Sequence, residues 1–128
     1  MPVGVNVALA QLGPRLRGTE ANIETMRGVV SDHPEADLVV FPELYLSGYV
    51  LDSIDELAVR PDGPELQSIA KIARESSTAL IFGAPEHVDD GVANSAFCLD
   101  ERRDVAAVYR KVQLFGGTRT TPSLLARS

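Results

Sequence analysis

The sequence predicts an α/β fold with a mixed sheet that has a parallel start and an antiparallel end. Up to Phe82, short apolar runs alternate with segments of helical period in the order β-α-β-α-β. Such alternation is typical of parallel strands joined by helical crossovers. Two further apolar runs then follow with only short polar turns between them, which is typical of antiparallel strands. The 128 residues suit a single domain.

Composition places the chain among ordinary globular proteins and narrows its partners. It is 45% hydrophobic and 23% charged, and its net charge is -6. Nucleic acids and anionic membrane surfaces require basic patches, so neither is expected as a partner. No apolar run approaches the roughly 18 residues of a membrane span. Residues 1–12 lack the basic segment and cleavage site of a secretory signal, so we expect a cytoplasmic protein.

The first two elements are a strand and a helix. Large apolar residues occupy alternate positions of residues 3–12, which predicts a strand. Thr19 is expected to cap the helix that follows. The apolar stripe of this helix consists of Ile23, Met26, Val29 and Val30. Helical spacing of this kind indicates packing and implies no chemistry.

The run Leu38–Phe41 predicts a strand buried on both faces, and it precedes the first candidate site residue. Pro42 cannot donate to a sheet ladder, so the strand is expected to end there. Glu43 then follows the carboxyl end, where ligands and catalytic groups collect in open α/β folds. Desolvation there would raise the pKa of its carboxyl towards that of a general base. A solvated glutamate in a turn is the alternative.

The middle of the chain predicts a loop, a helix and another strand. Residues 44–61 form the expected long loop, with one short helical turn near 53–58. Pro64 suits the first turn of the next helix, whose expected buried stripe consists of Leu66, Ile69, Ala70 and Ala73. A short buried strand is expected at residues 79–82, and Gly83 is expected to stop it.

The last elements predict the antiparallel part of the sheet. Residues 86–89 and 92–99 form an expected hairpin around an Asp90-Gly91 turn, and residues 105–111 form a further strand. The hairpin also carries residue types that ligate metals. Alternate strand residues point to opposite faces and cannot converge on one ion. A solvated hairpin is therefore favoured, and no metal site is expected.

Glu43 and Lys111 are the pair of residues that could carry chemistry. Lys111, like Glu43, follows an apolar strand. If both strands belong to one sheet, the two side chains could meet at one rim, transfer a proton and hold an oxyanion. A structural ion pair is one alternative. Another is an unrelated doubly wound domain in which the two residues lie far apart.

Three motifs occur in chain order. They are Phe41-Pro42-Glu43-Leu44 with Ser47-Gly48-Tyr49, Asn94-Ser95-Ala96, and Tyr109-Arg110-Lys111-Val112-Gln113-Leu114-Phe115-Gly116. The first and third resemble the two signatures of the carbon–nitrogen hydrolase (nitrilase/amidase) superfamily, although Gln113 stands where that family more commonly has His. The second matches the Asn-Ser/Thr pair that usually precedes the second signature. The resemblance covers residues 3–116 approximately.

The resemblance implies a fold, a reaction and roles for three residues. The fold is a four-layer α-β-β-α sandwich, of which residues 1–116 would form the amino-terminal half. The reaction is hydrolysis of a small amide, nitrile or carbamoyl compound through a cysteine thioester, by a Glu-Lys-Cys triad. By resemblance, Glu43 is the general base, Lys111 stabilises the oxyanion, and Tyr49 lines the substrate pocket. No organic cofactor and no metal is implied.

The chain departs from the family pattern at the nucleophile. The family's cysteine follows the second signature, whereas Cys98, the 1 cysteine of this chain, precedes Lys111 and lies in mid-strand. Mid-strand cysteines are usually small buried hydrophobic residues. We therefore expect that the nucleophile is absent and that the chain is inactive alone. The irregular tail, residues 117–128, lacks the acids that the family usually has there, and an out-of-frame tail or a premature stop would explain it.

A half-domain would leave one face of its sheet without a partner sheet. Each large apolar side chain left in water forfeits roughly 1.5–3 kcal/mol of burial, against a net stability of about 5–15 kcal/mol for a whole domain. We therefore expect marginal stability, with homo-oligomers or aggregates formed through that face. Two hypotheses follow: the amino-terminal part of a hydrolase, or a non-catalytic interaction module that self-associates or binds a full-length hydrolase.

Overall fold

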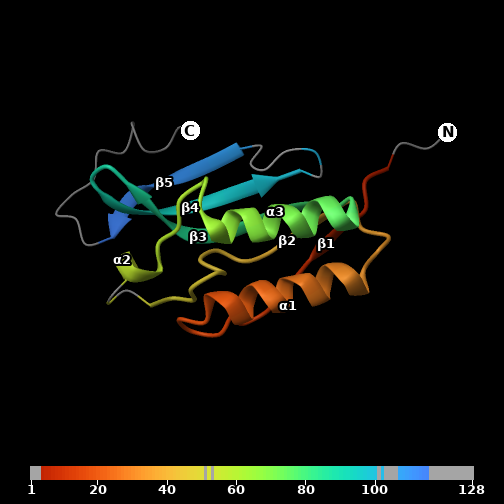
Figure 1. Ribbon diagram of the computed structural model, residues 1–128, viewed down its shortest axis with the longest axis horizontal. Helices are drawn as coiled ribbons and strands as arrows, with labels where there is room; N and C mark the ends of the chain where they lie inside the picture. Colours follow the sequence, from red (N-terminus) through yellow and green to blue (C-terminus); the bar gives the residue numbers. More distant parts are fainter. Residues whose placement is uncertain (1–3, 51, 53, 101, 103–106, 116–128) are drawn as a thin grey trace.

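The structure is a computed structural model that describes residues 4–50, 52, 54–100, 102 and 107–115. Its elements, in chain order, are β1 (Val7–Leu9), α1 (Thr19–Asp32), β2 (Leu38–Val40), α2 (Ile54–Leu57), α3 (Pro64–Ser76), β3 (Ala79–Val88), β4 (Gly91–Leu99) and β5 (Ala107–Phe115) (Figure 1). The tail boundary expected at 117–128 and most of the turn expected at 101–104 lie outside the described residues.

Within those residues the five strands form one sheet in the order β1-β2-β3-β4-β5. The pairs β1–β2 and β2–β3 are parallel, and the pairs β3–β4 and β4–β5 are antiparallel. The predicted mixed sheet is therefore confirmed. Because β1 and β2 run parallel to β3, their carboxyl ends point towards the same edge of the sheet. The segment that follows β2 emerges at that edge.

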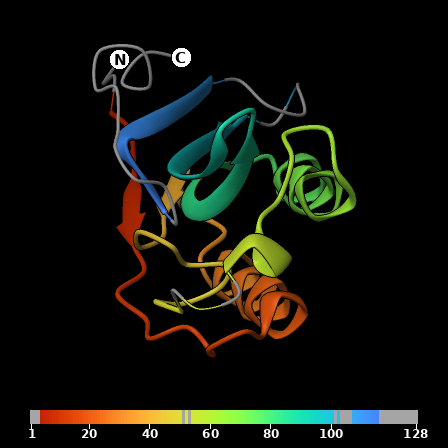
Figure 2. The same ribbon diagram turned by 90° about the vertical axis from the view of Figure 1, so that its left-hand side faces the viewer.

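Helices α1 and α3 lie together on one face of the sheet, so the described chain has two layers (Figure 2). Apolar side chains between the layers form one core. Its largest fully buried members are Tyr45, Phe82, Phe97, Met26, Leu46, Leu66, Ile69, Leu80 and Leu99. The rings of Phe82 and Phe97 stack with centroids 5.5 Å apart. The predicted packing stripes of both helices face this core, where burial of each large side chain contributes roughly 1.5–3 kcal/mol.

Several predicted boundaries are wrong. β1 covers only Val7–Leu9 of the strand expected at residues 3–12, and β5 continues past Lys111 to Phe115. Gly18 caps α1 without a side-chain hydrogen bond, and Thr19 is already helical. In the β3–β4 hairpin, Val88 pairs with Gly91, so the turn residues are Asp89 and Asp90. Periodicity locates the body of an element better than its end, because capping and turn geometry involve only a few atoms.

β3 is longer than expected and continues through Gly83 to Val88. The sequence reading took the glycine as a strand stop, but the structure uses it to let another backbone approach. A Cβ atom at Gly83 would lie 2.7 Å from the Cα of Glu43 and closer still to the amide nitrogen of Leu44. The backbone of Glu43 therefore packs directly on β3, at a distance that only glycine permits.

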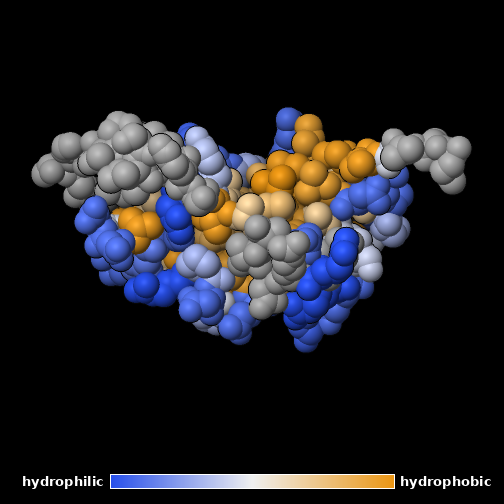
Figure 3. Space-filling model, turned by 90° about the horizontal axis from the view of Figure 1, so that it is seen from above, coloured by the Kyte–Doolittle hydropathy of each residue, from blue (hydrophilic) through white to orange (hydrophobic). Residues whose placement is uncertain are grey.

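The other face of the sheet carries apolar side chains that the described residues leave open. On β1, Val7 and Leu9 are 50% and 66% exposed, whereas Ala8 between them packs against the core. Tyr109 of β5 is 54% exposed. Figure 3 shows the apolar side chains gathered on this side of the molecule. We call it the open face. Separately, none of the described helices is long and apolar enough to cross a membrane.

Candidate active site

Glu43 follows β2 at the edge where the parallel strands end. The segment stays tied to β3 after β2 stops, because the Phe41 amide donates to the Ile81 carbonyl at 2.8 Å and the Gly83 amide donates to the Pro42 carbonyl at 3.1 Å. The next residue, Leu44, is fully buried with a φ of 52°. A left-handed conformation is unusual for a branched residue. Backbone pairing and buried packing therefore hold Glu43 at a sharp turn.

Lys111 lies on β5, two strands away from β3, and its ammonium reaches the Glu43 carboxylate. The distance from Lys111 Nζ to Glu43 Oε2 is 2.5 Å, and the two side chains are 54% and 37% exposed. Glu43 and Lys111, predicted from sequence to meet at one rim, are therefore in contact. The alternative of a doubly wound domain that separates them is wrong.

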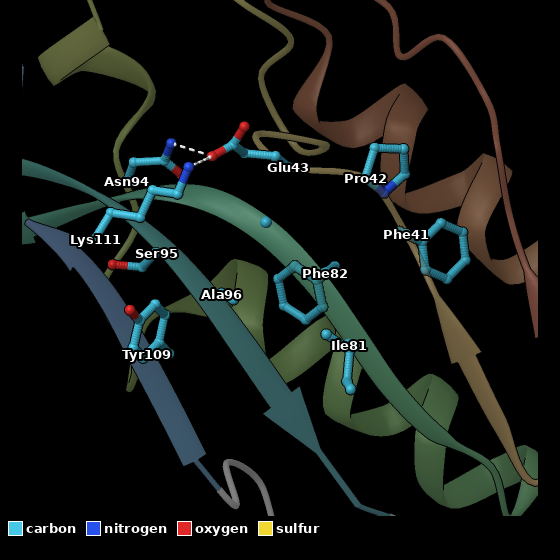
Figure 4. A pocket seen from close by; sticks show the side chains of 11 residues that line it. Phe41, Pro42, Glu43, Ile81, Phe82, Asn94, Ser95, Ala96, Tyr109 and Lys111 are labelled. Carbon is cyan, nitrogen blue, oxygen red and sulfur yellow. Dashed lines mark hydrogen bonds and ion pairs between the residues drawn. The ribbon is translucent and has the colours of Figure 1, made fainter. Parts of the chain in front are cut away.

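Two more side chains donate to the same carboxylate. Asn94 Nδ2 lies 2.8 Å from Glu43 Oε2, and the Tyr49 hydroxyl donates to Glu43 Oε1 at 2.5 Å. Figure 4 shows Asn94 and Lys111 converging on Glu43 from neighbouring strands. Asn94 is buried. Glu43 therefore accepts hydrogen bonds on both oxygens from groups that come from separate parts of the chain.

These donors lower the pKa of Glu43, contrary to the expectation from sequence. The pKa falls from 4.5 to about 2, chiefly through the hydrogen bond from Lys111, then through that from Tyr49, while burial acts in the opposite direction. The Glu43 carboxylate raises the pKa of the Lys111 ammonium and of the Tyr49 hydroxyl. Hydrogen bonding to the carboxylate thus outweighs desolvation, and Glu43 is ionised at neutral pH.

A pocket of about 190 Å³ opens beside this cluster. It is lined by Phe41, Pro42, Glu43, Ile81, Phe82, Gly83, Asn94, Ser95, Ala96, Tyr109 and Lys111 (Figure 4). Its walls are mainly apolar, and its charged groups are Glu43 and Lys111, which suits a small uncharged molecule with one polar group. Tyr49 does not line this pocket; its hydroxyl contacts Glu43 instead. The role of Tyr49 in substrate binding stays a prediction.

A second carboxylate, Glu86, contradicts the solvated hairpin expected there. It is 1% exposed, and Arg110 donates two hydrogen bonds to it, from Nε to Oε1 and from Nη2 to Oε2, both 2.8 Å. The Ser95 hydroxyl donates to Oε1 at 2.7 Å. The sequence reading missed this cluster. Its one signal was strand alternation, because Arg110 must face away from Lys111 and Ser95 away from Asn94.

Cys98 is not brought to the Glu43–Lys111 pair. It lies on β4 opposite Ala107 of β5, which is four residues or about 13 Å along the strand from Lys111 at roughly 3.3 Å per residue. Burial, followed by the charge of Asp100, raises the pKa of the Cys98 thiol. A thiol with a raised pKa forms little thiolate and is a poor nucleophile. Among the described residues, no His, Cys, Asp and Glu cluster could hold a metal.

Comparison with known proteins supports the resemblance to the carbon–nitrogen hydrolase superfamily. The family model for carbon-nitrogen hydrolase matches residues 6–127. The chain is 38% identical over 115 residues to the "hydrolase in pqqF 5'region" of Pseudomonas protegens. It is 30% identical over 118 residues to an (R)-stereoselective amidase of Pseudomonas sp.. The alignments cover 88% and 91% of this chain but 40% and 43% of those proteins, so the chain spans less than half their length.

Solved structures agree with the fold. An amidase from Nesterenkonia sp. superposes with a TM-score of 0.74 at 28% identity, over 88% of this chain and 44% of that chain. Related structures of that amidase include variants in complex with acrylamide and with butyramide, and one with acrylamide added to the active-site cysteine. A CN-hydrolase superfamily protein from Xanthomonas campestris superposes with a TM-score of 0.77 at 24% identity, which supports the fold alone.

The pairing of the two signature motifs at Glu43 and Lys111, together with the family match over residues 6–127, leads to one conclusion. The chain belongs to the carbon-nitrogen hydrolase family.

Proposed function

We propose that this chain supplies the base and the oxyanion-stabilising cation of a hydrolase that acts on a small amide, nitrile or carbamoyl compound through a cysteine thioester. The observation that carries the proposal is the contact of 2.5 Å between Glu43 and Lys111, beside a pocket of about 190 Å³. Beside one small apolar pocket, the carboxylate can accept the proton of an attacking group, and the ammonium can stabilise the oxyanion that the attack produces.

The chemistry assigns each residue a separate task. Glu43, ionised and held by Asn94 and Tyr49, accepts the proton of an attacking thiol and later returns it to the leaving amine. The Lys111 ammonium would stabilise the negative charge that develops on the carbonyl oxygen of the tetrahedral intermediate. Because the pKa of Glu43 is about 2, it is a weak base while Lys111 binds it. Movement of the Lys111 ammonium away from Glu43 and towards the oxyanion would raise the pKa of Glu43 when the thiol attacks.

We infer that the nucleophile lies outside the described residues, and Cys98 is not proposed for this role. Its strand position and the raised pKa of its thiol both oppose nucleophilic attack. We propose that the 128 residues are inactive by themselves and that a later segment supplies the cysteine. The downstream nucleotide sequence, read in three frames, tests this and also tests whether residues 117–128 are out of frame. If none of the three frames encodes a cysteine at a strand–helix turn, the proposal is wrong.

An activity assay tests the remaining roles directly. The chain is incubated with butyramide or acrylamide, alone and together with a cysteine-bearing carboxyl-terminal segment of a family member, and ammonia release is measured. We expect no release from the chain alone. In the combined protein, Glu43→Gln should lower kcat by roughly 100-fold or more. Release by the chain alone that Cys98→Ser abolishes would overturn the proposal, and so would full activity in Glu43→Gln.

A second candidate function is a non-catalytic interaction module, which the open face favours. Val7 and Leu9 are at least half exposed on that face. Left in water, they favour burial against a second copy of the chain, which is the occupant we propose. Light scattering over a range of concentrations tests this, with a full-length hydrolase as competitor.

A cytoplasmic location is also part of the proposal and accords with the free thiol of Cys98; cell fractionation checks it.

A further inference from the structure

Two carboxylates lie on opposite sides of one pair of strands, and each takes one residue from each strand. On β4, Asn94 donates to Glu43 and the next residue, Ser95, donates to Glu86. On β5, Lys111 binds Glu43 and the preceding residue, Arg110, binds Glu86. Neighbouring strand residues face opposite ways. The partially exposed Glu43 cluster is therefore joined, through two peptide units, to the buried Glu86 cluster.

The register of β5 changes at the residue that carries the ammonium. Ser95 pairs with Arg110, and Ala93 pairs with Leu114. Asn94 alone on β4 therefore lies opposite the stretch 111–113 of β5. Such a bulge interrupts the ladder and re-aims side chains. Lys111 is the first residue of the bulged stretch, so the regular ladder fixes it on one side only, at Arg110.

Glu86 is well placed to fix Arg110. Glu86 is 1% exposed, and its two carboxylate oxygens accept hydrogen bonds from Nε and Nη2 of Arg110, both at 2.8 Å. The backbone on either side of it is also held, because the Val59 amide donates to the Pro85 carbonyl at 2.8 Å and the His87 amide donates to the Val59 carbonyl at 2.9 Å. A bidentate pair fixes both distance and orientation. Sliding β5 along β4 would therefore break two charge-assisted hydrogen bonds in a buried site.

The geometry points to a positioning role for the Glu86–Arg110–Ser95 cluster: it holds β5 in the register that puts Lys111 against Glu43. The meaning of that placement for catalysis rests on the function proposed above. The cluster touches no part of the pocket's charged pair directly and acts through the peptide bond between Arg110 and Lys111. Arg110 and Glu86 are thus positioning residues, and a change in either is transmitted to the opposite face.

The test measures the ionisation of Glu43 while the cluster behind it is altered. The side-chain carboxyl carbon of Glu43, assigned with Glu43→Gln, is titrated by NMR in the full chain. Arg110→Lys keeps the positive charge but removes the bidentate hydrogen bonding to Glu86. Ser95→Ala removes one hydrogen-bond donor to Glu86. Lys111→Met serves as the reference for complete loss of the pair. Arg27→Lys, which alters an exposed arginine bound to Glu24 at 3.5 Å, is the matched control.

We expect the pKa of Glu43 to rise from about 2 by roughly one unit in Arg110→Lys, in the direction of Lys111→Met, since an opposite charge nearby shifts a carboxyl by about 1–3 units. Ser95→Ala should shift it the same way by less, and Arg27→Lys should leave it unchanged. If Arg110→Lys does not fold, Ser95→Ala decides: a rise supports the inference and no rise overturns it.

The outcomes also separate this inference from the proposed function. If Lys111→Met raises the pKa of Glu43 but folded Arg110→Lys does not, Glu86–Arg110 is merely a structural ion pair and the inference is wrong while the proposed function stands. If Lys111→Met leaves that pKa unchanged, there is no pair to position, and both fail. A shift in Arg27→Lys equal to that in Arg110→Lys would also overturn the inference.

Discussion

A side chain at residue 83 would begin 2.7 Å from the Cα of Glu43. Gly83 thus sets how closely β3 approaches the turn that presents the carboxylate. The Gly83 amide also donates to the Pro42 carbonyl at 3.1 Å, and its carbonyl accepts from the Leu46 amide at 3.2 Å. A residue that offers no side chain to the pocket therefore determines where the carboxylate lies.

Gly83→Ala should destabilise the protein and displace Glu43, because the new methyl group meets backbone atoms that have no alternative position. Overpacking of this kind costs about 1–3 kcal/mol. The matched control is Gly28→Ala within α1, where a Cβ meets nothing within 4 Å and the change should stabilise by about 0.5–1 kcal/mol. Urea unfolding measures both. Equal stability of Gly83→Ala and the wild type would contradict the close approach.

Tyr49→Phe should raise the pKa of Glu43, but by less than Lys111→Met does. Lys111 is the largest cause of the depressed pKa, and the Tyr49 hydroxyl is the second. Removing one neutral donor leaves the ammonium in place. A carboxyl titration by NMR checks the order, with Tyr109→Phe as the control because the Tyr109 ring lines the pocket without donating to Glu43 in the described structure. A larger rise in the pKa of Glu43 in Tyr49→Phe than in Lys111→Met would mean that the Tyr49 hydroxyl, and not Lys111, is the main cause of the lowered pKa.

Stability should decline as the pH falls from 4.5 towards 2, in part through Glu43. Its folded pKa of about 2 lies below the ordinary value of 4.5. Protonation therefore favours the unfolded chain in that interval, and the stabilisation present above pH 4.5 is lost. Glu43→Gln should show a shallower acid limb in thermal unfolding. Because the carboxylate is partly exposed, salt should weaken the difference; a salt-independent difference would contradict an ion pair.

Alkaline pH should destabilise the protein through Tyr45. Burial raises the pKa of its hydroxyl from 10 to about 12, and the hydroxyl donates to the Asn22 carbonyl at 2.8 Å. Because the folded pKa is the higher one, stability is fully present below pH 10 and is lost as the pH rises towards 12. Thermal unfolding of Tyr45→Phe should lack this dependence. Phenolate absorbance that shows Tyr45 ionising with an ordinary pKa would overturn the prediction.

Leu9→Lys should weaken self-association through the open face. Leu9 is 66% exposed on β1, and a lysine there places a hydrated charge in the apolar surface. Leu16→Lys, at a loop residue that is 62% exposed, is the matched control. Because the net charge is -6, raising the salt should strengthen association of the wild type by screening repulsion. Concentration-dependent sedimentation that is identical in both variants would exclude the open face as the contact.

Helices and strands could be predicted where the pattern was long enough. The stripes of α1 and α3, the order of the strands and the break at Pro42 all followed from periodicity and from the chemistry of proline. Glu43 was found because it follows an apolar strand, and strand ends meet at sheet edges. Lys111 was also expected just past a strand, but it lies within β5, which runs from Ala107 to Phe115. The helix cap and the hairpin turn were misplaced, since those depend on local hydrogen bonds that many residue types can make.

The sequence by itself determined the α/β class, the family resemblance and the two charged residues of the site, because these depend on residue order and spacing alone. Only the tertiary structure decided that Gly83 continues β3 instead of ending it, that Glu86 is buried against Arg110, and that the pKa of Glu43 falls instead of rising. Each of these depends on atoms from segments distant in sequence. Contact between such segments arises from packing, which no local pattern records.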